Sequence, residues 1–345
     1  MSTSVSGRIC PYPFSRLESP GKPFIPCCQS WLTKEFLGLD SGADPWNGPS
    51  AQALRASVLD GSYRYCHLER CATTLLTEKE LRARQSQPGE LPISAGNLDA
   101  LLAGKTILPE GPAALTVMGD PRCNLACGSC RPSPILQNSS AIEDSVQKTQ
   151  SLLATHGKSL RIVKLAGDGE VFFSPALREI LRSFSRERFP KLEKVDVLTN
   201  GVLFDADTLH ALMPGSNFIR SVNVSIDAGD AETYQKVRGG DWARLLQNLL
   251  WMAKQRKIGR FDFLGLTYVL RAENFRSLPA FLSMAESLGA DEVYVSQLFP
   301  WERMGISFAK EAVHLPEHPE YAEFLALWKN ERAPARSFRW RTNLE

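Results

Sequence analysis

Three cysteines set close together are the residues of this sequence best suited to chemistry. Cys123, Cys127 and Cys130 follow one another with a C-x3-C-x2-C spacing. A four-iron cluster normally takes one cysteinate per iron, so three thiolates on one loop leave one iron without a protein ligand. An open coordination position distinguishes a metal that does chemistry from one that only supports structure. Zinc is the alternative metal, but no histidine lies within twenty residues of this loop.

The bulk composition is that of an ordinary globular protein. The chain has 345 residues, 43% hydrophobic and 23% charged, which is enough for one large α/β domain and a small extra module. The net charge of +2 comes from interspersed charges, without a basic patch for nucleic acid. No apolar run reaches the roughly 18 residues of a membrane span, and the polar first residues lack a signal core. We therefore expect a cytoplasmic, reducing location and no membrane or nucleic-acid partner.

The other cysteines are confined to the first 71 residues. They are Cys10, Cys27, Cys28, Cys66 and Cys71. A protein that used cysteine as core filler would also scatter some along its last two hundred residues. In a reducing compartment, clustered cysteines bind metal more often than they form disulfides. The pattern therefore predicts a second metal site, which four thiolates could form around either an iron–sulfur cluster or zinc.

From about residue 113 onward, short apolar runs alternate with amphipathic stretches of helical period. The strand candidates are 114–118, 159–166, 194–198, 221–226, 261–270 and 292–297. The helix candidates are 141–155, 175–184, 206–213, 242–257 and 277–288. This alternation predicts an α/β fold whose parallel sheet curls into a partial (β/α)6, TIM-like barrel. In such barrels the active site lies at the C-terminal ends of the strands.

The barrel is predicted to occupy residues 111–298, and the flanking segments have other patterns. Residues 1–75 are rich in loops, with a short helix at 51–59, and contain the second cysteine group. Residues 76–110 form a connector with helical stretches at 77–85 and 97–103. Residues 299–345 form a C-terminal extension whose tail, 333–345, is expected to be a mobile cap or partly disordered.

The C-x3-C-x2-C spacing after the first strand of a partial barrel resembles the radical S-adenosylmethionine (SAM) superfamily, from about residue 113 to 298. The resemblance implies a [4Fe-4S] cluster on the cysteine loop, whose open iron is chelated by the amino and carboxylate groups of SAM. Reductive cleavage of SAM would then give a 5′-deoxyadenosyl radical that abstracts hydrogen from the substrate. An electron donor such as flavodoxin or ferredoxin is the implied partner. Ser129 replaces the aromatic residue that the family often has before its third cysteine.

The resemblance extends to the sequence after the second predicted strand. There the chain reads Ala-Gly-Asp-Gly-Glu, similar to the family's Gly-Gly-Glu motif, with Asp168 in the first glycine position. Gly167 and Gly169 would let the backbone approach the ligand closely. By resemblance, Glu170 would accept hydrogen bonds from the SAM ammonium. The alternative is an ordinary turn with a solvated carboxylate.

Polar residues also follow the third and fourth predicted strands. Asn200 closes the third strand, although Asn-Gly is also a common turn. By resemblance, Ser225 would bind the ribose hydroxyls of SAM, and Asp227 would do likewise or orient a neighbour. Arg238 lies in a segment that resembles one presenting an arginine to the SAM carboxylate, a task that suits a bidentate guanidinium. A surface arginine is the alternative for this position.

The first cysteine group resembles the accessory modules called SPASM or twitch domains. The matching elements are Cys-Pro at 10–11, Pro-Cys-Cys at 26–28, Trp-Asn at 46–47, Arg55 and the closing cysteines 66 and 71. The resemblance implies a second [4Fe-4S] cluster, for which we take Cys10, Cys27, Cys66 and Cys71 as ligands and Cys28 as an alternative to Cys27. Zinc remains the other metal that would fit. The family usually places this module after the barrel, whereas here it precedes the barrel.

Several functions remain open from the sequence. Tyr294 and Glu302 lie at or after the sixth predicted strand and are candidates for a general base that deprotonates the substrate. Each could equally be a rim residue without a catalytic role. The reaction would be an oxidative modification of a peptide, or a dehydrogenation or epimerisation of a sugar or other small metabolite. The alternative of another class is a zinc-stabilised barrel that binds a partner and catalyses nothing.

Overall fold

The computed structural model of the protein describes residues 7–19, 24–69, 71, 75–85, 92–136, 139–167, 169–300, 304–332 and 334–344. Two predicted site residues, Asp168 and Glu302, lie outside these ranges. The chain divides into two compact units. The first comprises Met1–Asp120, Ser139–Asp168 and Ser183–Val195, and the second comprises Pro121–Asn138, Gly169–Arg182 and Asp196–Glu345.

Within each unit the strands are parallel and follow one another in the order of the chain. Within the described residues they are β1 (Arg16–Ser19), β2 (Ala114–Val117), β3 (Ile162–Leu165), β4 (Lys194–Thr199), β5 (Ile219–Ser225), β6 (Phe263–Leu270), β7 (Glu292–Gln297) and β8 (Arg339–Thr342). In the first unit β1 pairs with β2 and β2 with β3. In the second unit β5 to β8 pair in the same sense. The predicted α/β fold is confirmed, and its strand order is that of a partial TIM-like barrel.

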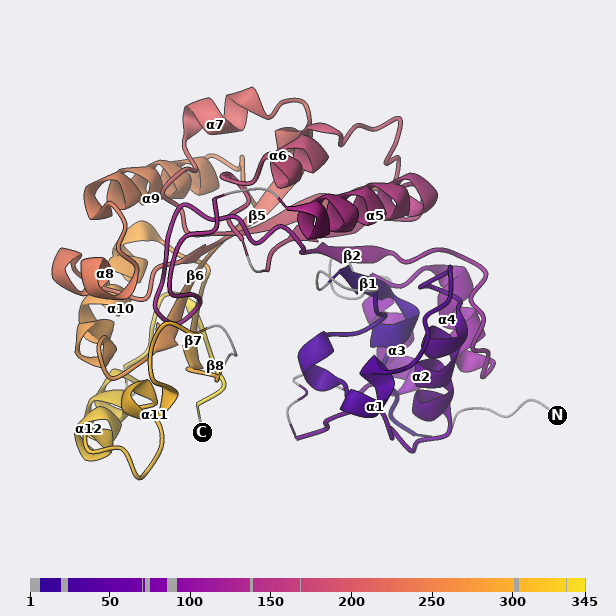
Figure 1. Ribbon diagram of the computed structural model, residues 1–345, viewed down its shortest axis with the longest axis horizontal. Helices are drawn as coiled ribbons and strands as arrows, with labels where there is room; N and C mark the ends of the chain where they lie inside the picture. Colours follow the sequence, from indigo (N-terminus) through magenta and orange to yellow (C-terminus); the bar gives the residue numbers. More distant parts are fainter. Residues whose placement is uncertain are drawn as a thin grey trace. The chain divides into compact units, whose positions relative to one another are not determined.

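The helices that alternate with these strands are α5 (Ser140–His156), α6 (Pro175–Arg182), α7 (Ala206–Ala211), α8 (Ala231–Val237), α9 (Trp242–Lys257) and α10 (Leu278–Leu288). Five of these helices bury apolar residues, and α7 buries none; the N-cap side chains of α5, α7, α8 and α9 accept a hydrogen bond from a backbone amide in the first turn. In α9, for example, Leu245, Leu249 and Met252 are fully buried at helical spacing. The Asp241 side chain accepts a hydrogen bond from the Arg244 amide and so satisfies one of the first free N–H groups of α9. Figure 1 shows α8, α9 and α10 along one side of β6 and β7.

The sheet contains two strands that the sequence does not predict. β1 and β8 are four residues long, and both lie at sheet edges, next to β2 and β7 respectively. β8 pairs with β7 over its whole length: Arg339 lies opposite Glu292, and Thr342 lies opposite Val295. This part of the tail is therefore a strand and not disordered. Both strands contain charged residues and neither has an apolar run, so neither is among the six strands predicted from apolar runs.

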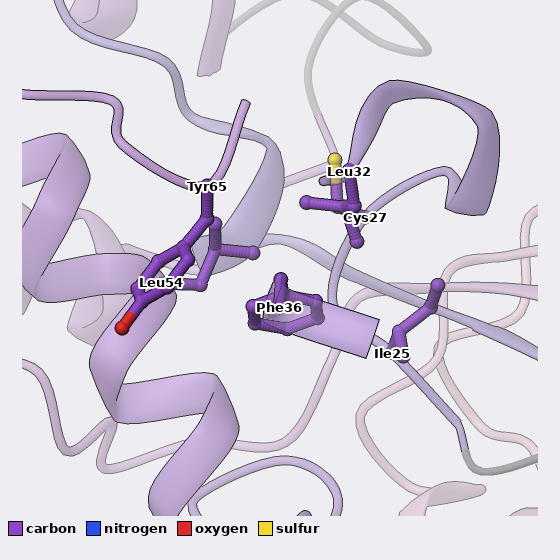
Figure 2. Packing of buried hydrophobic residues seen from close by; sticks show 6 residues of the cluster. All are labelled: Ile25, Cys27, Leu32, Phe36, Leu54 and Tyr65. Carbon is purple, nitrogen blue, oxygen red and sulfur yellow. The ribbon is translucent and has the colours of Figure 1, made fainter. Parts of the chain in front are cut away.

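The cysteine-rich part of the first unit is built from short helices and loops. They are η1 (Tyr12–Phe14), η2 (Gln29–Trp31), α1 (Lys34–Leu37), α2 (Pro49–Leu59), α3 (Glu78–Gln85) and α4 (Ala95–Leu102). The three helices predicted here, at 51–59, 77–85 and 97–103, correspond to α2, α3 and α4. Figure 2 shows the small core of this region, formed by Ile25, Cys27, Leu32, Phe36, Leu54 and Tyr65.

A buried arginine joins the loops of this region. Arg55 is fully buried in α2, and its Nε donates to the Pro13 carbonyl at 2.9 Å. Its Nη1 donates to Asn47 Oδ1 at 3.0 Å and to the Thr106 carbonyl at 2.9 Å. The guanidinium also lies over the Trp46 ring, 4.5 Å from its centroid. Arg55 therefore holds together segments that are far apart in the sequence.

The C-terminal part of the second unit adds α11 (Phe308–Glu311) and α12 (Tyr321–Arg332) before β8. Two short turns of 3-10 helix, η3 (Gly215–Phe218) and η4 (Phe275–Ser277), precede β5 and α10. Aromatic rings connect these elements, because Phe324 of α12 meets Phe275 of η4, and Trp328 of α12 meets Trp340 of β8. None of the helices in the described ranges is long and apolar enough to cross a membrane.

Candidate active site

The cysteine loop follows β2, and each of its three sulfur atoms accepts hydrogen bonds from N–H groups. The Leu125 amide donates to Cys123 Sγ at 3.4 Å, and Asn200 Nδ2 approaches the same sulfur at 3.8 Å. Arg238 Nη1 donates to Cys127 Sγ at 3.4 Å. Arg131 Nε and Nη2 donate to Cys130 Sγ at 3.4 and 3.3 Å. Donors of this kind, two of them guanidinium groups, suit sulfur atoms that become thiolates.

Arg238 is the buried cation of the site. It is the C-cap of α8, and its Nη2 lies 2.8 Å from Asp227 Oδ2. Burial would lower the pKa of Arg238, but the carboxylate of Asp227 and the thiol of Cys127 beside it raise the pKa. The guanidinium therefore stays charged next to Cys127.

Asp227 holds Arg238 from the end of β5. Its backbone has a φ of +59°, in the left-handed region that a non-glycine residue adopts only at a cost. Its Oδ1 accepts from the Val269 amide at 2.7 Å, and its carbonyl accepts from Asn274 Nδ2 at 3.0 Å. In the structure Asp227 orients a neighbour, which is one of the two roles predicted for it.

Glu170 is a buried carboxylate that joins its own loop to the end of β4. Its Oε1 accepts from Thr199 Oγ1 at 2.6 Å and from the Phe172 amide at 3.2 Å, and its Oε2 accepts from the Asn200 amide at 2.7 Å. Burial raises the pKa of Glu170, and these hydrogen bonds counteract that effect. A carboxylate has about four acceptor positions, so about one remains for a ligand.

Asn200 connects this carboxylate to the cysteine loop. Besides its approach to Cys123, its Nδ2 donates to Asn124 Oδ1 at 2.9 Å, and its Oδ1 accepts from the Val202 amide at 3.0 Å. The structure therefore brings Glu170, Asn200 and Cys123 together, as expected for residues at neighbouring strand ends. Whether they contact SAM stays a prediction.

Ser225 ends β5, and its hydroxyl lies 3.0 Å from that of Thr267 on β6. Gly167, in the first unit, has a φ of +121°, and a Cβ at this position would collide with the side chain of Met118. Gly169 follows at the start of the segment that contains Glu170. The assignment of these residues to SAM stays a prediction.

Tyr294, one of the two proposed bases, lies within β7 and not after it. The guanidinium of Arg341 on β8 is 5.5 Å from the centroid of its ring, and burial raises the pKa of its phenol. A tyrosine with a raised pKa stays protonated at neutral pH, so a role as base would need a further partner.

Two buried side chains near the cysteine loop were missed by the sequence analysis. Tyr234 lies one helical turn before Arg238 on α8, near enough to Cys127 to interact electrostatically with it, and its hydroxyl has no hydrogen-bond partner among the described residues. Arg271 follows β6 directly, and its Nη1 is likewise buried without a partner in the described ranges. Its position directly after a predicted strand could have marked Arg271 as a site residue. A single arginine after a strand is usually a surface residue, however, so this position alone did not identify it.

These observations test whether the cysteine loop fits an iron–sulfur cluster. The donors are soft thiols, surrounded by N–H groups and by buried donors that lack partners. Among the residues that the structure describes, no three His, Cys, Asp or Glu side chains stand close enough to share a single metal ion. A zinc ion needs its ligands within about 2.3 Å of one point, whereas a cluster distributes them over several irons. Soft thiol donors surrounded by N–H groups are a donor set that fits an iron–sulfur cluster.

The cysteines of the first unit also lie near one another. Burial, with smaller contributions from the neighbouring thiols of Cys71 and Cys66, raises the pKa of Cys10 to about 12. Burial likewise raises the pKa of Cys27 well above its usual value, to which Cys10 and Cys66 contribute. Burial also raises the pKa of Cys28, and the nearby carboxylate of the buried Glu18 and the thiol of Cys71 contribute in the same direction. The five thiols therefore lie near enough to interact electrostatically, and the choice of Cys10, Cys27, Cys66 and Cys71 as ligands stays a prediction.

Comparison with known proteins gives matches over parts of the chain. The antilisterial bacteriocin subtilosin biosynthesis protein AlbA of Bacillus subtilis strain 168 is 33% identical over 120 residues, which are 34% of this chain and 25% of AlbA. A probable GTP 3′,8-cyclase of Saccharolobus solfataricus is 27% identical over 168 residues, 48% of this chain and 51% of that protein. The chain therefore spans a quarter and about half of the lengths of these two relatives.

Similar solved structures include SuiB of Streptococcus suis, with a TM-score of 0.48 and 14% identity over 77% of this chain and 58% of SuiB. A radical SAM methyltransferase from Sphaerobacter thermophilus gives a TM-score of 0.39 at 14% identity, over 64% and 63% of the two chains. Residues 120–285 match the family model of the radical SAM superfamily. This part of the chain, with the cysteine loop near its start, is therefore a domain of the radical SAM superfamily.

Proposed function

We propose that the protein is a radical SAM enzyme that modifies its substrate oxidatively, with a peptide as the favoured substrate. The observation that carries this proposal is the set of N–H donors directed at all three sulfur atoms of the cysteine loop. Cys123, Cys127 and Cys130 would hold a [4Fe-4S] cluster and leave one iron for SAM. The chemistry supplied by the bound cluster and SAM is the reductive cleavage of SAM to a 5′-deoxyadenosyl radical that takes a hydrogen atom from the substrate.

The residues around the loop would bind and orient SAM. Arg238 offers a charged guanidinium beside Cys127, and Asp227 fixes the direction in which it points. Glu170 has about one acceptor position left for the ammonium group. Ser225, at the end of β5, offers a hydroxyl for the ribose. Such preorganised charges and dipoles would not need to rearrange during the reaction.

We further propose a second [4Fe-4S] cluster in the first unit, held by Cys10, Cys27, Cys66 and Cys71. The mutual proximity of these thiols supports the proposal. We take Cys27 as the ligand in preference to Cys28, because the thiol of Cys27 interacts with those of Cys10 and Cys66, whereas that of Cys28 interacts with Cys71. A fully ligated cluster would accept an electron from the substrate radical, which would make the reaction a net oxidation.

The relatives bear on the substrate class. AlbA belongs to the biosynthesis of a bacteriocin, whereas the other relative is described as a nucleotide cyclase. A bacteriocin is a peptide product, and AlbA has the higher identity of the two over its matched segment, so we favour a peptide over a small metabolite. An electron donor of the flavodoxin or ferredoxin type would be the protein partner.

Anaerobic reconstitution with iron and sulfide tests the proposal. The wild-type protein should bind about eight irons and, with SAM and dithionite, form 5′-deoxyadenosine. Cys127→Ala should form none and keep about four irons. Cys28→Ala is the matched control and should retain both the iron and the 5′-deoxyadenosine. Zinc in place of iron, or 5′-deoxyadenosine formation by Cys127→Ala, would contradict the proposal.

A further inference from the structure

Arg271 is a buried arginine whose guanidinium has protein partners at two of its three nitrogen atoms. It follows β6 directly, and only 2% of its side chain is exposed. Its Nη2 donates to Glu273 Oε2 at 3.3 Å, and its Nε lies 3.9 Å from Glu311 Oε2. Its Nη1 is also buried but has no hydrogen-bond partner among the described residues. A buried donor without a partner is costly, so such a group in a ligand-free protein points to a missing acceptor.

The free nitrogen is directed at the cysteine loop. A Cβ placed on Gly128, between the second and third cysteines, would lie 3.5 Å from Nη1 and 2.8 Å from Ile306 Cγ2. The Gly305 amide donates to the Gly128 carbonyl at 2.9 Å, so the segment after β7 also reaches this point. Arg271, the loop and this segment therefore meet at the C-terminal end of β6, where a barrel of this kind binds its ligands.

The two glutamates determine what kind of ligand this arginine can take. They face Nη2 and Nε, and so leave the two N–H groups of the buried Nη1 without a carboxylate partner among the described residues. The ligand must be an acceptor, and a negative charge on it makes the hydrogen bond stronger. A doubly charged phosphate would be repelled by both glutamates more strongly than a singly charged carboxylate. The site therefore favours a single carboxylate.

We propose that Arg271 binds a carboxylate group of the substrate at the end of β6. This inference rests on the proposed function, because it takes the open ends of the strands as the place where the substrate binds. The carboxylate of SAM is the other possible source of the same group. Arg238 reaches a thiol of the loop, at Cys127, whereas Arg271 approaches the loop at its glycine. Of the two arginines, Arg271 is therefore the one available to the substrate.

The test compares two small probes that differ only in charge. Acetyl-glutamate methylamide and acetyl-glutamine methylamide are titrated calorimetrically into the reconstituted, SAM-loaded protein at low salt. The wild-type protein should bind the carboxylate probe about tenfold more tightly than the amide, the size of effect that one charge-assisted hydrogen bond gives. Arg271→Gln should lose this discrimination, and Arg271→Lys should keep part of it. The affinity for SAM should change less than twofold in either variant.

Arg276→Gln is the matched control. Arg276 also has two glutamate partners, Glu320 and Glu323, but it is about half exposed and should not affect either probe. Loss of SAM affinity without loss of probe discrimination in Arg271→Gln would overturn the proposal, because Arg271 would then belong to the SAM site. Equal binding of both probes by the wild type would overturn it as well. Probe binding does not require SAM cleavage, so a failure of the proposed function would appear separately, as absence of 5′-deoxyadenosine.

Discussion

Replacing Asp227 by asparagine should destabilise the protein by leaving a buried arginine without its counter-charge. The side chains of Asp227 and Arg238 are only 5% and 11% exposed. Removing one partner from a buried ion pair costs about 3–5 kcal/mol, because the remaining charge cannot be solvated. Asparagine preserves the acceptor for the Val269 amide and tolerates the positive φ, so it removes little more than the charge. We expect a loss of about 3 kcal/mol.

A double variant separates the charge effect from other damage. In Asp227→Asn combined with Arg238→Met, no buried charge is left without a partner, so about 1–2 kcal/mol of the loss should be recovered. Asp262→Asn is the control, because its ion pair with Arg220 is exposed and should contribute less than about 1 kcal/mol.

The assay is equilibrium unfolding of the metal-free, reduced protein in urea, followed by tryptophan fluorescence. The free energy of unfolding falls linearly with urea concentration. When variant and wild type share the same slope, a change in the urea concentration at the unfolding midpoint reports a change in stability. If Asp227→Asn stays within about 0.5 kcal/mol of the wild type, or if the double variant is as unstable as the sum of its two single variants, the reasoning is wrong.

Three further variants test other parts of the structure. Asp230 caps α8, so Asp230→Ala should lower the stability by about 1 kcal/mol in thermal unfolding. Burial tends to raise the pKa of Asp230, but hydrogen bonds led by that from Ser277 lower it overall, so its contribution is present above the ordinary carboxyl pKa near 4 and is lost as the pH falls through the lowered value. The stability difference between variant and wild type should therefore shrink as the pH is lowered below the ordinary carboxyl pKa. Arg55→Met removes the donor of the Pro13 and Thr106 carbonyls and one of the two donors of Asn47 Oδ1, and should cost about 3–5 kcal/mol in urea unfolding; a loss below about 1 kcal/mol would contradict the role of this arginine. Gly128→Ala should cost about 1–3 kcal/mol through its clash with Ile306, and Ile306→Ala should relieve it, which a double-mutant cycle measures.

Much of the barrel could be predicted because its pattern is local. The strands β2 and β4 to β7 are apolar runs that stand within a few residues of their predicted bounds, and α9 coincides with the predicted helix at 242–257. Burial on both faces of a parallel sheet produces such runs, so the sequence itself contains the signal. The cysteine loop was found for the same reason, since its spacing is short.

The parts that were missed depend on contacts between distant residues. β8 contains arginines in alternation with Trp340 and Thr342, and only its pairing with β7 makes it a strand. The helix α8 is seven residues long, too short to show a clear period. The role of Asp227 is set by Val269 and Arg238, which come from other elements and cannot be identified as partners from spacing.

The charges at the cysteine loop depend on whether metal is bound. Burial raises the pKa of Cys123 to about 11, so without metal this side chain is a neutral thiol, while Arg238 remains charged and is neutralised by Asp227. If the loop holds the proposed cluster, binding of iron would release a proton from Cys123, and the thiolates would add negative charge beside Arg238 and Arg131. Asp227 compensates for the missing thiolate charge before iron binds, and the two guanidinium groups compensate for the thiolates afterwards. The same arginine–aspartate pair can thus stabilise the metal-free fold and still leave the sulfur atoms ready to bind iron.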